Sequence, residues 1–132
     1  MEQRKPAGLR IFLADDEAAV IQTLTVLLKL DGHFIEWAND GEKAFARLTD
    51  PSADFDVLIT DHVMPVLTGM QLVTKLRTAN FRGKIIVLSG FLTSAIEEDY
   101  RALEVDHILR KPFDVVSLRA ALAQVEEATG GT

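Results

Sequence analysis

Short, almost continuous apolar segments alternate along the chain with longer segments in which apolar residues recur every three or four positions. The short segments are typical of strands buried on both faces of a sheet, and the longer ones of helices with one buried face. The predicted strands are Leu9–Ala14, His33–Ala38, Phe55–Thr60, Ile85–Leu88 and His107–Arg110. Because strands and helices alternate, the pattern predicts an α/β fold with a doubly wound, five-stranded parallel sheet and helices on both faces.

The predicted helices follow the strands. The first carries one apolar stripe, formed by Val20, Ile21, Leu24, Leu27 and Leu28. It is expected to end at Asp31-Gly32, because glycine readily takes the left-handed conformation that closes a helix. The others are predicted near Gly41–Leu48, Met70–Thr78, Ser94–Leu103 and Val115–Val125. Trp37 and Phe45 are expected to be packing residues.

Four of the strands are followed by residues suited to phosphate or metal chemistry. These residues are Asp15 and Asp16, Asp61, Ser89, and Lys111. In an open parallel sheet, ligands bind in the crevice outside the carboxyl ends of the strands, so these side chains are expected to converge. Three neighbouring carboxylates repel one another and need a cation or a shared proton. Mg²⁺ fits, because it prefers a few carboxylates together with waters and phosphate oxygens.

Length and composition narrow the function classes. The 132 residues fit one domain, expected over residues 8–128 with flexible termini at 1–7 and 129–132. The 14 basic and 20 acidic residues give a net charge of −6, which argues against direct binding to nucleic acid. The chain has no cysteine, and we find neither a signal peptide nor an apolar run long enough to span a membrane. A cytoplasmic protein without membrane insertion is therefore expected.

The strand-end motifs resemble those of the receiver domain family of two-component response regulators, over about residues 8–128. The matching segments are Ile11–Glu17, Asp61–Gly69, Leu88–Gly90 and Lys111–Phe113. Each motif is weak alone, but all four in this order at strand ends are specific. The resemblance implies a flavodoxin-like sheet with strand order 2-1-3-4-5. It also implies a signalling switch, not a metabolic enzyme, that accepts a phosphoryl group from a sensor histidine kinase or a phosphotransfer protein.

The resemblance also assigns residues at the acceptor site. Asp61 matches the phosphoacceptor, whose carboxylate would form an acyl phosphate. Asp15 and Asp16 match the acidic pair that holds Mg²⁺. Asp61 and the backbone carbonyl of Val63 would be further ligands of the ion. His62, which directly follows Asp61, is not assigned to the site.

Further assignments concern the fourth and fifth strands. Ser89 matches the hydroxyl residue that hydrogen-bonds a phosphoryl oxygen, and Lys111 matches the lysine that pairs with the phosphoryl group. The family holds the peptide bond between Lys111 and Pro112 in the cis form. Ile108 departs from the family pattern, because many members have Tyr or Phe there as an aromatic switch. Val63 cannot position an attacking water, so we expect a comparatively long-lived acyl phosphate.

The resemblance points to an output by protein–protein contact with an unknown downstream protein. The output surface would be formed by Ser94–Leu103, His107–Arg110 and the last helix. No further element is expected after the last helix, so the chain would be either a single-domain regulator or the receiver of a larger protein. The resemblance does not separate a switch from a phosphoryl relay.

Other interpretations remain open. Taken singly, the site residues also fit turns, helix caps or solvated surface positions. The domain could be a receiver-like interaction module that is never phosphorylated. A phosphatase of the haloacid dehalogenase type would need Asp-x-Asp after the first strand, whereas here Glu17 lies two residues after Asp15. A flavodoxin-like small-molecule binder would need a phosphate loop rich in Gly, Ser and Thr.

Overall fold

The computed structural model describes residues 8–130. Its strands are β1 (Arg10–Ala14), β2 (Phe34–Ala38), β3 (Val57–Asp61), β4 (Lys84–Ser89) and β5 (His107–Arg110). They form one sheet in the order β2-β1-β3-β4-β5, and every neighbouring pair is parallel. The expected fold class and strand order are therefore confirmed.

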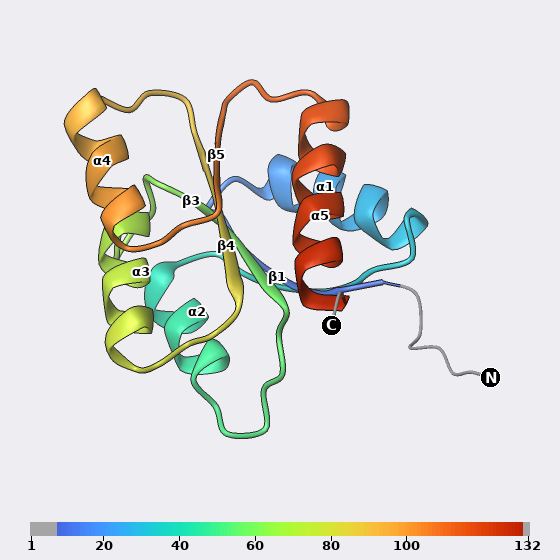
Figure 1. The fold of residues 1–132 in the computed structure, drawn as a ribbon, viewed down its shortest axis with the longest axis horizontal. Coiled ribbons are helices and arrows are strands. Elements are labelled where there is room, and N and C mark those ends of the chain that lie inside the picture. Colours follow the sequence, from blue (N-terminus) through green and yellow to red (C-terminus); the bar gives the residue numbers. More distant parts are fainter. Residues whose placement is uncertain (1–7, 131–132) are drawn as a thin grey trace.

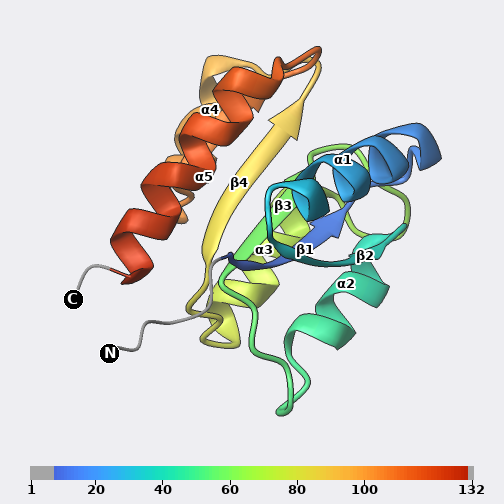
Figure 2. The ribbon, with the colours of Figure 1, turned by 90° about the vertical axis from the view of Figure 1, so that its right-hand side faces the viewer.

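The helices cover both faces of the sheet. They are α1 (Ala18–Leu30), α2 (Gly41–Leu48), α3 (Gly69–Thr78), α4 (Ser94–Ala102) and α5 (Val115–Gly130). Figure 1 shows α1 and α5 on one side of the strands and α2, α3 and α4 on the other. Figure 2 shows the same arrangement from the side, with α1 and α5 toward the viewer.

The core consists of two apolar clusters, one on each face of the sheet. Alternate residues of β1 enter different clusters: Ile11 packs with the residues of α1 and α5, and Phe12 packs with those of α2, α3 and α4. This alternation follows from the two-residue period of a strand. Because both faces are buried, β1, β3 and β4 are apolar along most of their length, as the sequence pattern indicated.

Specific residues at the helix ends determine where α1 stops and where α3 begins. Gly32 has a φ of 94°, and its N–H donates to the carbonyl of Lys29 at 2.9 Å, so it closes α1 as expected. Thr68 and Gln71 form a capping box at the start of α3. This cap starts α3 one residue earlier than the sequence pattern indicated.

Some boundaries differ from the sequence-based expectations. β3 begins at Val57, because the carboxylate of Asp56 accepts a hydrogen bond from the backbone N–H of Arg10 at 2.8 Å ahead of the strand ladder. Trp37 was expected to pack, but it is 53% exposed on the edge strand β2. Phe45 packs partly buried against the second cluster, as expected.

The expected flexible termini fall largely outside the described residues, which exclude 1–7 and 131–132. The backbone of residues 129 and 130 is helical as the end of α5. Within the described residues, no helix is long and apolar enough to cross a membrane.

Candidate functional site

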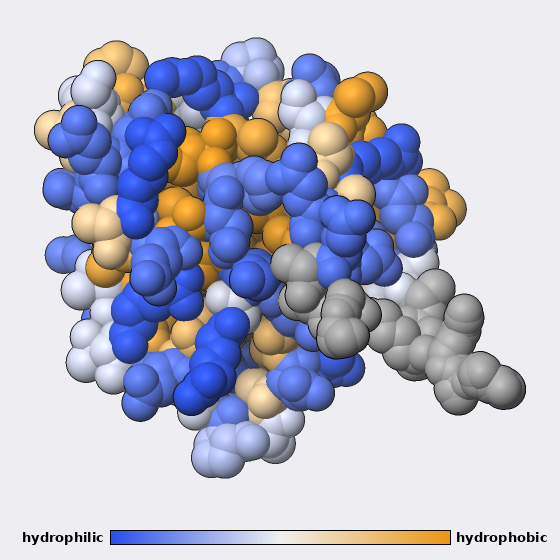
Figure 3. Space-filling model, viewed as in Figure 1, coloured by the Kyte–Doolittle hydropathy of each residue, from blue (hydrophilic) through white to orange (hydrophobic). Residues whose placement is uncertain are grey.

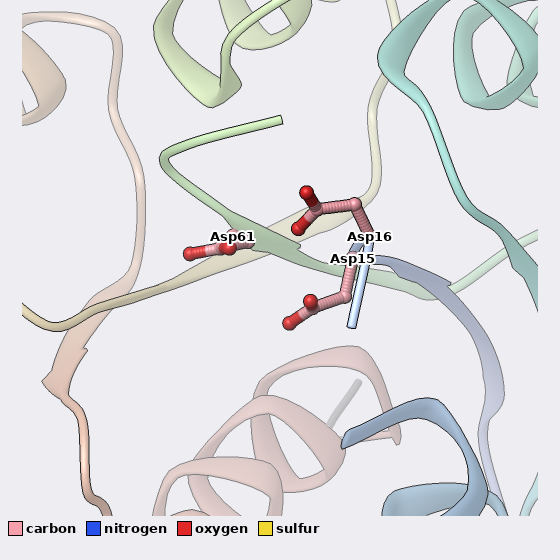
Figure 4. A group of neighbouring side chains, drawn as sticks. All are labelled: Asp15, Asp16 and Asp61. Carbon is pink, nitrogen blue, oxygen red and sulfur yellow. The ribbon is translucent and has the colours of Figure 1, made fainter. Parts of the chain in front are cut away.

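Three acidic side chains meet at the carboxyl ends of β1 and β3. Asp15 and Asp16 directly follow β1, and Asp61 is the last residue of β3. One carboxylate oxygen from each lies within 4.8 Å of the others. Figure 4 shows Asp15 and Asp16 side by side, with Asp61 next to them on the neighbouring strand. The predicted convergence of these three residues is therefore present.

Lys111 brings a positive charge to this cluster from the end of β5. Its Nζ lies 3.1 Å from Asp15 Oδ2 and 3.4 Å from Asp61 Oδ2. A third partner, Glu17, lies 3.1 Å away. Sequence reasoning missed Glu17 as a partner of Lys111, because no local pattern reports which carboxylate a distant lysine reaches.

The charges and burial of these groups fit a divalent cation. Asp15 and Asp61 are buried and Asp16 is exposed, so the cluster opens to solvent on one side. Three carboxylates, those of Asp15, Glu17 and Asp61, contact the ammonium of Lys111, and Asp16 adds a fourth to the group, so negative charge is in excess. Oxygen ligands with excess negative charge are the donor set that Mg²⁺ takes in proteins.

Electrostatics perturb the titration of two groups in the site. Burial and the neighbouring Asp15 carboxylate raise the pKa of Asp61 above its ordinary value, against the opposing charge of Lys111. Burial opposes the charged form of Lys111, but hydrogen bonds to Glu17 and Asp15 and the charge of Asp61 raise its pKa overall. Lys111 is therefore a permanent cation at neutral pH.

Ser89 lies at the same edge of the sheet, as the last residue of β4. It is buried, and its hydroxyl donates to the carbonyl of Phe91 at 3.2 Å and accepts from the N–H of Phe91 at 3.3 Å. The backbone N–H of Lys111 donates to the carbonyl of Ser89 at 2.7 Å, which ties the ends of β4 and β5 together. The Ser89 hydroxyl is thus near the predicted site but is bonded within its own loop.

Loop geometry shapes the rest of the site. Val63 lies in the loop after β3 with a side chain that is 67% exposed. Val66 in the same loop has a φ of 71°, a conformation that β-branched residues rarely adopt. The peptide bond between Lys111 and Pro112 is cis, as the family resemblance implied.

A further contact next to Asp61 involves residues that sequence reasoning did not assign to the site. The backbone N–H of His62 donates to Asp61 Oδ1 at 2.8 Å. The Nδ1 of His62 is hydrogen-bonded to the hydroxyl of Tyr100, a fully buried residue of α4. Burial lowers the pKa of His62 and raises that of Tyr100, so the pair is uncharged at neutral pH.

Comparison with known proteins places these residues in a family. The sequence profile described as "response regulator receiver domain" matches residues 11–123. The transcriptional regulatory protein PrrA of Mycobacterium leprae is 31% identical over 125 residues, which cover 93% of this chain and 52% of PrrA. The response regulator receiver protein CpdR of Brucella abortus is 30% identical over 109 residues, 83% of this chain and 89% of CpdR.

The chain spans about half the length of several curated relatives that it matches. Among solved structures, the signal receiver domain of an HD domain-containing protein from Pseudomonas fluorescens Pf-5 superposes with a TM-score of 0.85 and 25% identity. That match covers 98% of this chain and 100% of the other. The response regulator TrrA of Thermotoga maritima, solved in complex with Mg²⁺ and BeF, gives a TM-score of 0.77 at 26% identity, over 89% of this chain and 98% of TrrA. With its sheet order and strand-end residues, the chain therefore belongs to the receiver domain family of two-component response regulators.

Proposed function

We propose that this domain is a phosphoacceptor switch in which Asp61 receives a phosphoryl group from a sensor histidine kinase or a phosphotransfer protein. One observation carries the proposal: Asp61 lies beside a second buried carboxylate, Asp15, while both face the ammonium of Lys111. A carboxylate that attacks a phosphoryl group must stay ionised, while nearby cations screen the repulsion between it and the phosphoryl oxygens. Lys111 and a bound cation would supply that screening.

The transfer forms an oxygen–phosphorus bond at Asp61 and breaks the nitrogen–phosphorus bond of the donor phosphohistidine, whose imidazole leaves. Mg²⁺, held by Asp15, Asp16, Asp61 and the backbone carbonyl of Val63, would balance charge on the phosphoryl oxygens. Lys111 already contacts Asp61 Oδ2 at 3.4 Å and is placed to pair with an added phosphoryl oxygen.

Ser89 has to change partners for the role proposed here. Its hydroxyl would leave Phe91 and donate to a phosphoryl oxygen, because a charged acceptor forms a stronger hydrogen bond than a neutral carbonyl. Ser89 precedes α4 along the chain, and Lys111, which is bonded to it through the backbone, precedes α5. Movement of both residues would therefore reach both helices.

The output surface proposed here consists of α4, β5 and α5. Arg110 of β5 pairs with Glu97 of α4 at 2.8 Å, so the end of β5 is linked to α4 by side chains as well as by the sheet. Figure 3, in the same view as Figure 1, shows apolar atoms between α4 and α5 with hydrophilic residues around them. A downstream protein would bind this face, and the proposed kinase-dependent role implies the cytoplasm.

The experiment that tests this function is intact mass spectrometry after incubation with Mg²⁺ and acetyl phosphate. We expect a single phosphoryl adduct in the native chain, and none with EDTA or in Asp61→Asn. The control variant Asp31→Asn removes an exposed carboxylate that pairs with Arg119 far from the site, and should phosphorylate normally. A folded native chain without an adduct would contradict the proposal and favour the unphosphorylated interaction module.

A further inference from the structure

Helix α4 has one fully buried side chain in its contact with the fold. Every residue of α4 is described, and among them Tyr100 alone is buried, with no accessible surface. Ile96 and Glu97 of the same helix are only partly buried, so burial of this large aromatic ring contributes strongly to the position of α4. A change in the contacts of Tyr100 would therefore affect the position of α4.

The polar end of Tyr100 reaches the residue that follows the phosphoacceptor. Its hydroxyl is hydrogen-bonded to His62 Nδ1, and the two rings pack edge to face with centroids 5.5 Å apart. A phenol hydroxyl buried in an apolar cluster needs a partner, because an unpaired buried hydroxyl has lost its hydrogen bonds to water without replacement. His62 supplies that partner.

The pocket around this hydroxyl requires a glycine. A Cβ atom on Gly69 would lie 2.9 Å from the Tyr100 hydroxyl and 2.4 Å from the carbonyl oxygen of Asp61. The N–H of Gly69 also donates to the carbonyl of His62 at 2.8 Å. The start of α3 therefore encloses His62 and the Tyr100 hydroxyl directly against the end of β3.

His62 is in turn bonded to the carboxylate of the phosphoacceptor. Its backbone N–H donates to Asp61 Oδ1 at 2.8 Å. An acyl phosphate at Asp61 would no longer present that charged acceptor, since one carboxylate oxygen would bridge to phosphorus and the other would become a neutral carbonyl oxygen. The backbone of His62 would then be held differently, and its ring is the group that contacts Tyr100.

At position 108, β5 has no hydroxyl that could make a similar contact beside Asp61. Ile108 belongs to the same apolar cluster as Tyr100 but has no hydroxyl to report on the site. In the described part of the chain, Tyr100 is the aromatic residue whose polar atom reaches the residue beside Asp61.

We propose that the hydrogen bond between His62 and Tyr100 couples phosphorylation of Asp61 to the position of helix α4. Phosphorylation shifts an existing equilibrium of α4 by changing the strength of this bond, as any two-state element is biased by a differential contact. Tyr100 is thus a positioning residue. The inference rests on the phosphoacceptor function proposed above.

The test compares amide NMR shifts of α4 before and after phosphorylation in the native chain and in Tyr100→Phe, with the adduct verified by intact mass. Tyr100→Phe keeps the ring and removes only the hydroxyl, so the adduct should form as in the native chain. The α4 response to phosphorylation should fall roughly fivefold, the effect of losing one hydrogen bond on an equilibrium constant. Thr74→Val, which removes an exposed hydroxyl from α3, should keep the full response.

A second variant excludes a purely structural effect of the first. His62→Phe removes the other partner, and the double variant should lose no more of the response than either single variant, because both changes break the same bond. If Tyr100→Phe retains the full α4 response, or the two variants have additive effects, the coupling proposal is wrong while the phosphoacceptor function stands. If the native chain forms no adduct, the phosphoacceptor function fails and the coupling fails with it.

Discussion

At the scale of single residues, Lys111 balances the charge of the site. Its ammonium contacts Asp15, Glu17 and Asp61 at 3.1, 3.1 and 3.4 Å. The Asp15 side chain has no exposed surface, and that of Lys111 is 17% exposed, so solvent screens this cluster weakly. The ion pairs here therefore affect stability more than those on the surface.

We predict that Lys111→Gln lowers the free energy of unfolding by about 1–3 kcal/mol in the absence of divalent cations, because two buried carboxylates lose their counter-charge. Urea denaturation in EDTA measures this. The control Arg119→Gln breaks the exposed pair with Asp31 and should have a small effect, since solvent screens it. An unfolding free energy that is the same in Lys111→Gln and the native chain would show that the ammonium does not stabilise the cluster.

Backbone conformation is a second determinant at this scale. Val66 has a φ of 71°, which costs an L-residue with a β-branched side chain about 1–2 kcal/mol. Val66→Gly should raise the free energy of unfolding by about 0.5–1 kcal/mol net of the greater entropy of glycine in the unfolded chain. Denaturation that shows a lower stability for this variant would mean that packing of the half-exposed loop outweighs the strain.

At the scale of elements, the loop between β3 and α3 directly follows Asp61 and carries Val63. The Val63 side chain is exposed and apolar, so it would offer no hydrogen bond to a water that attacks the acyl phosphate of the proposed function. Val63→Asn adds such a group at the same position and should shorten the acyl phosphate half-life by about tenfold through positioning of the water. The decay of the adduct mass after removal of acetyl phosphate gives the half-life, and an unchanged value would contradict this role for Val63.

Strands were predicted correctly from the sequence where the apolar pattern matches the burial in the structure. β1 and β4 were predicted because both faces of each strand are buried, so their apolar segments are continuous. The predicted start of β3 at Phe55 was wrong, because the carboxylate of Asp56 accepts a hydrogen bond from the backbone of Arg10 just before the strand begins at Val57. The exposure of Trp37 was missed although the strand order implied by the resemblance puts this strand at the edge of the sheet, because an apolar residue type does not show how much of an edge strand is covered.

At the scale of the whole molecule, the alternation of strands and helices predicted a parallel sheet and the convergence of Asp15, Asp61 and Lys111, and the family resemblance implied the strand order. Parallel strands place their carboxyl ends at one edge, so the site follows from the fold. The pair formed by His62 and Tyr100 could not be predicted, because it joins two residues 38 positions apart through side-chain packing that no periodicity records. The sequence signal was faint: Tyr100 is the only tyrosine of the chain.

The burial of Tyr100 leads us to predict how the stability of the chain depends on alkaline pH. Burial raises the pKa of Tyr100 in the folded chain, so above the unfolded value of about 10 the unfolded chain releases a proton that the folded chain keeps. Stability therefore falls as pH rises through this range, by about 1.4 kcal/mol per pH unit from this group. In denaturation experiments, the free energy of unfolding should fall less steeply with pH in Tyr100→Phe than in the native chain. The tyrosinate absorbance of the folded native chain should appear only above the unfolded pKa of about 10. An equal slope in both chains would contradict the burial of the hydroxyl.

In the proposed function, Asp61 alone among the four clustered carboxylates accepts the phosphoryl group. The most direct measurement is peptide mass mapping after phosphorylation with Mg²⁺ and acetyl phosphate, followed by borohydride reduction of the acyl phosphate. We expect reduction at Asp61 and unchanged Asp15, Asp16 and Glu17. Reduction at any of those three residues in place of Asp61, or no reduced residue in a chain that carries the phosphoryl mass, would contradict it.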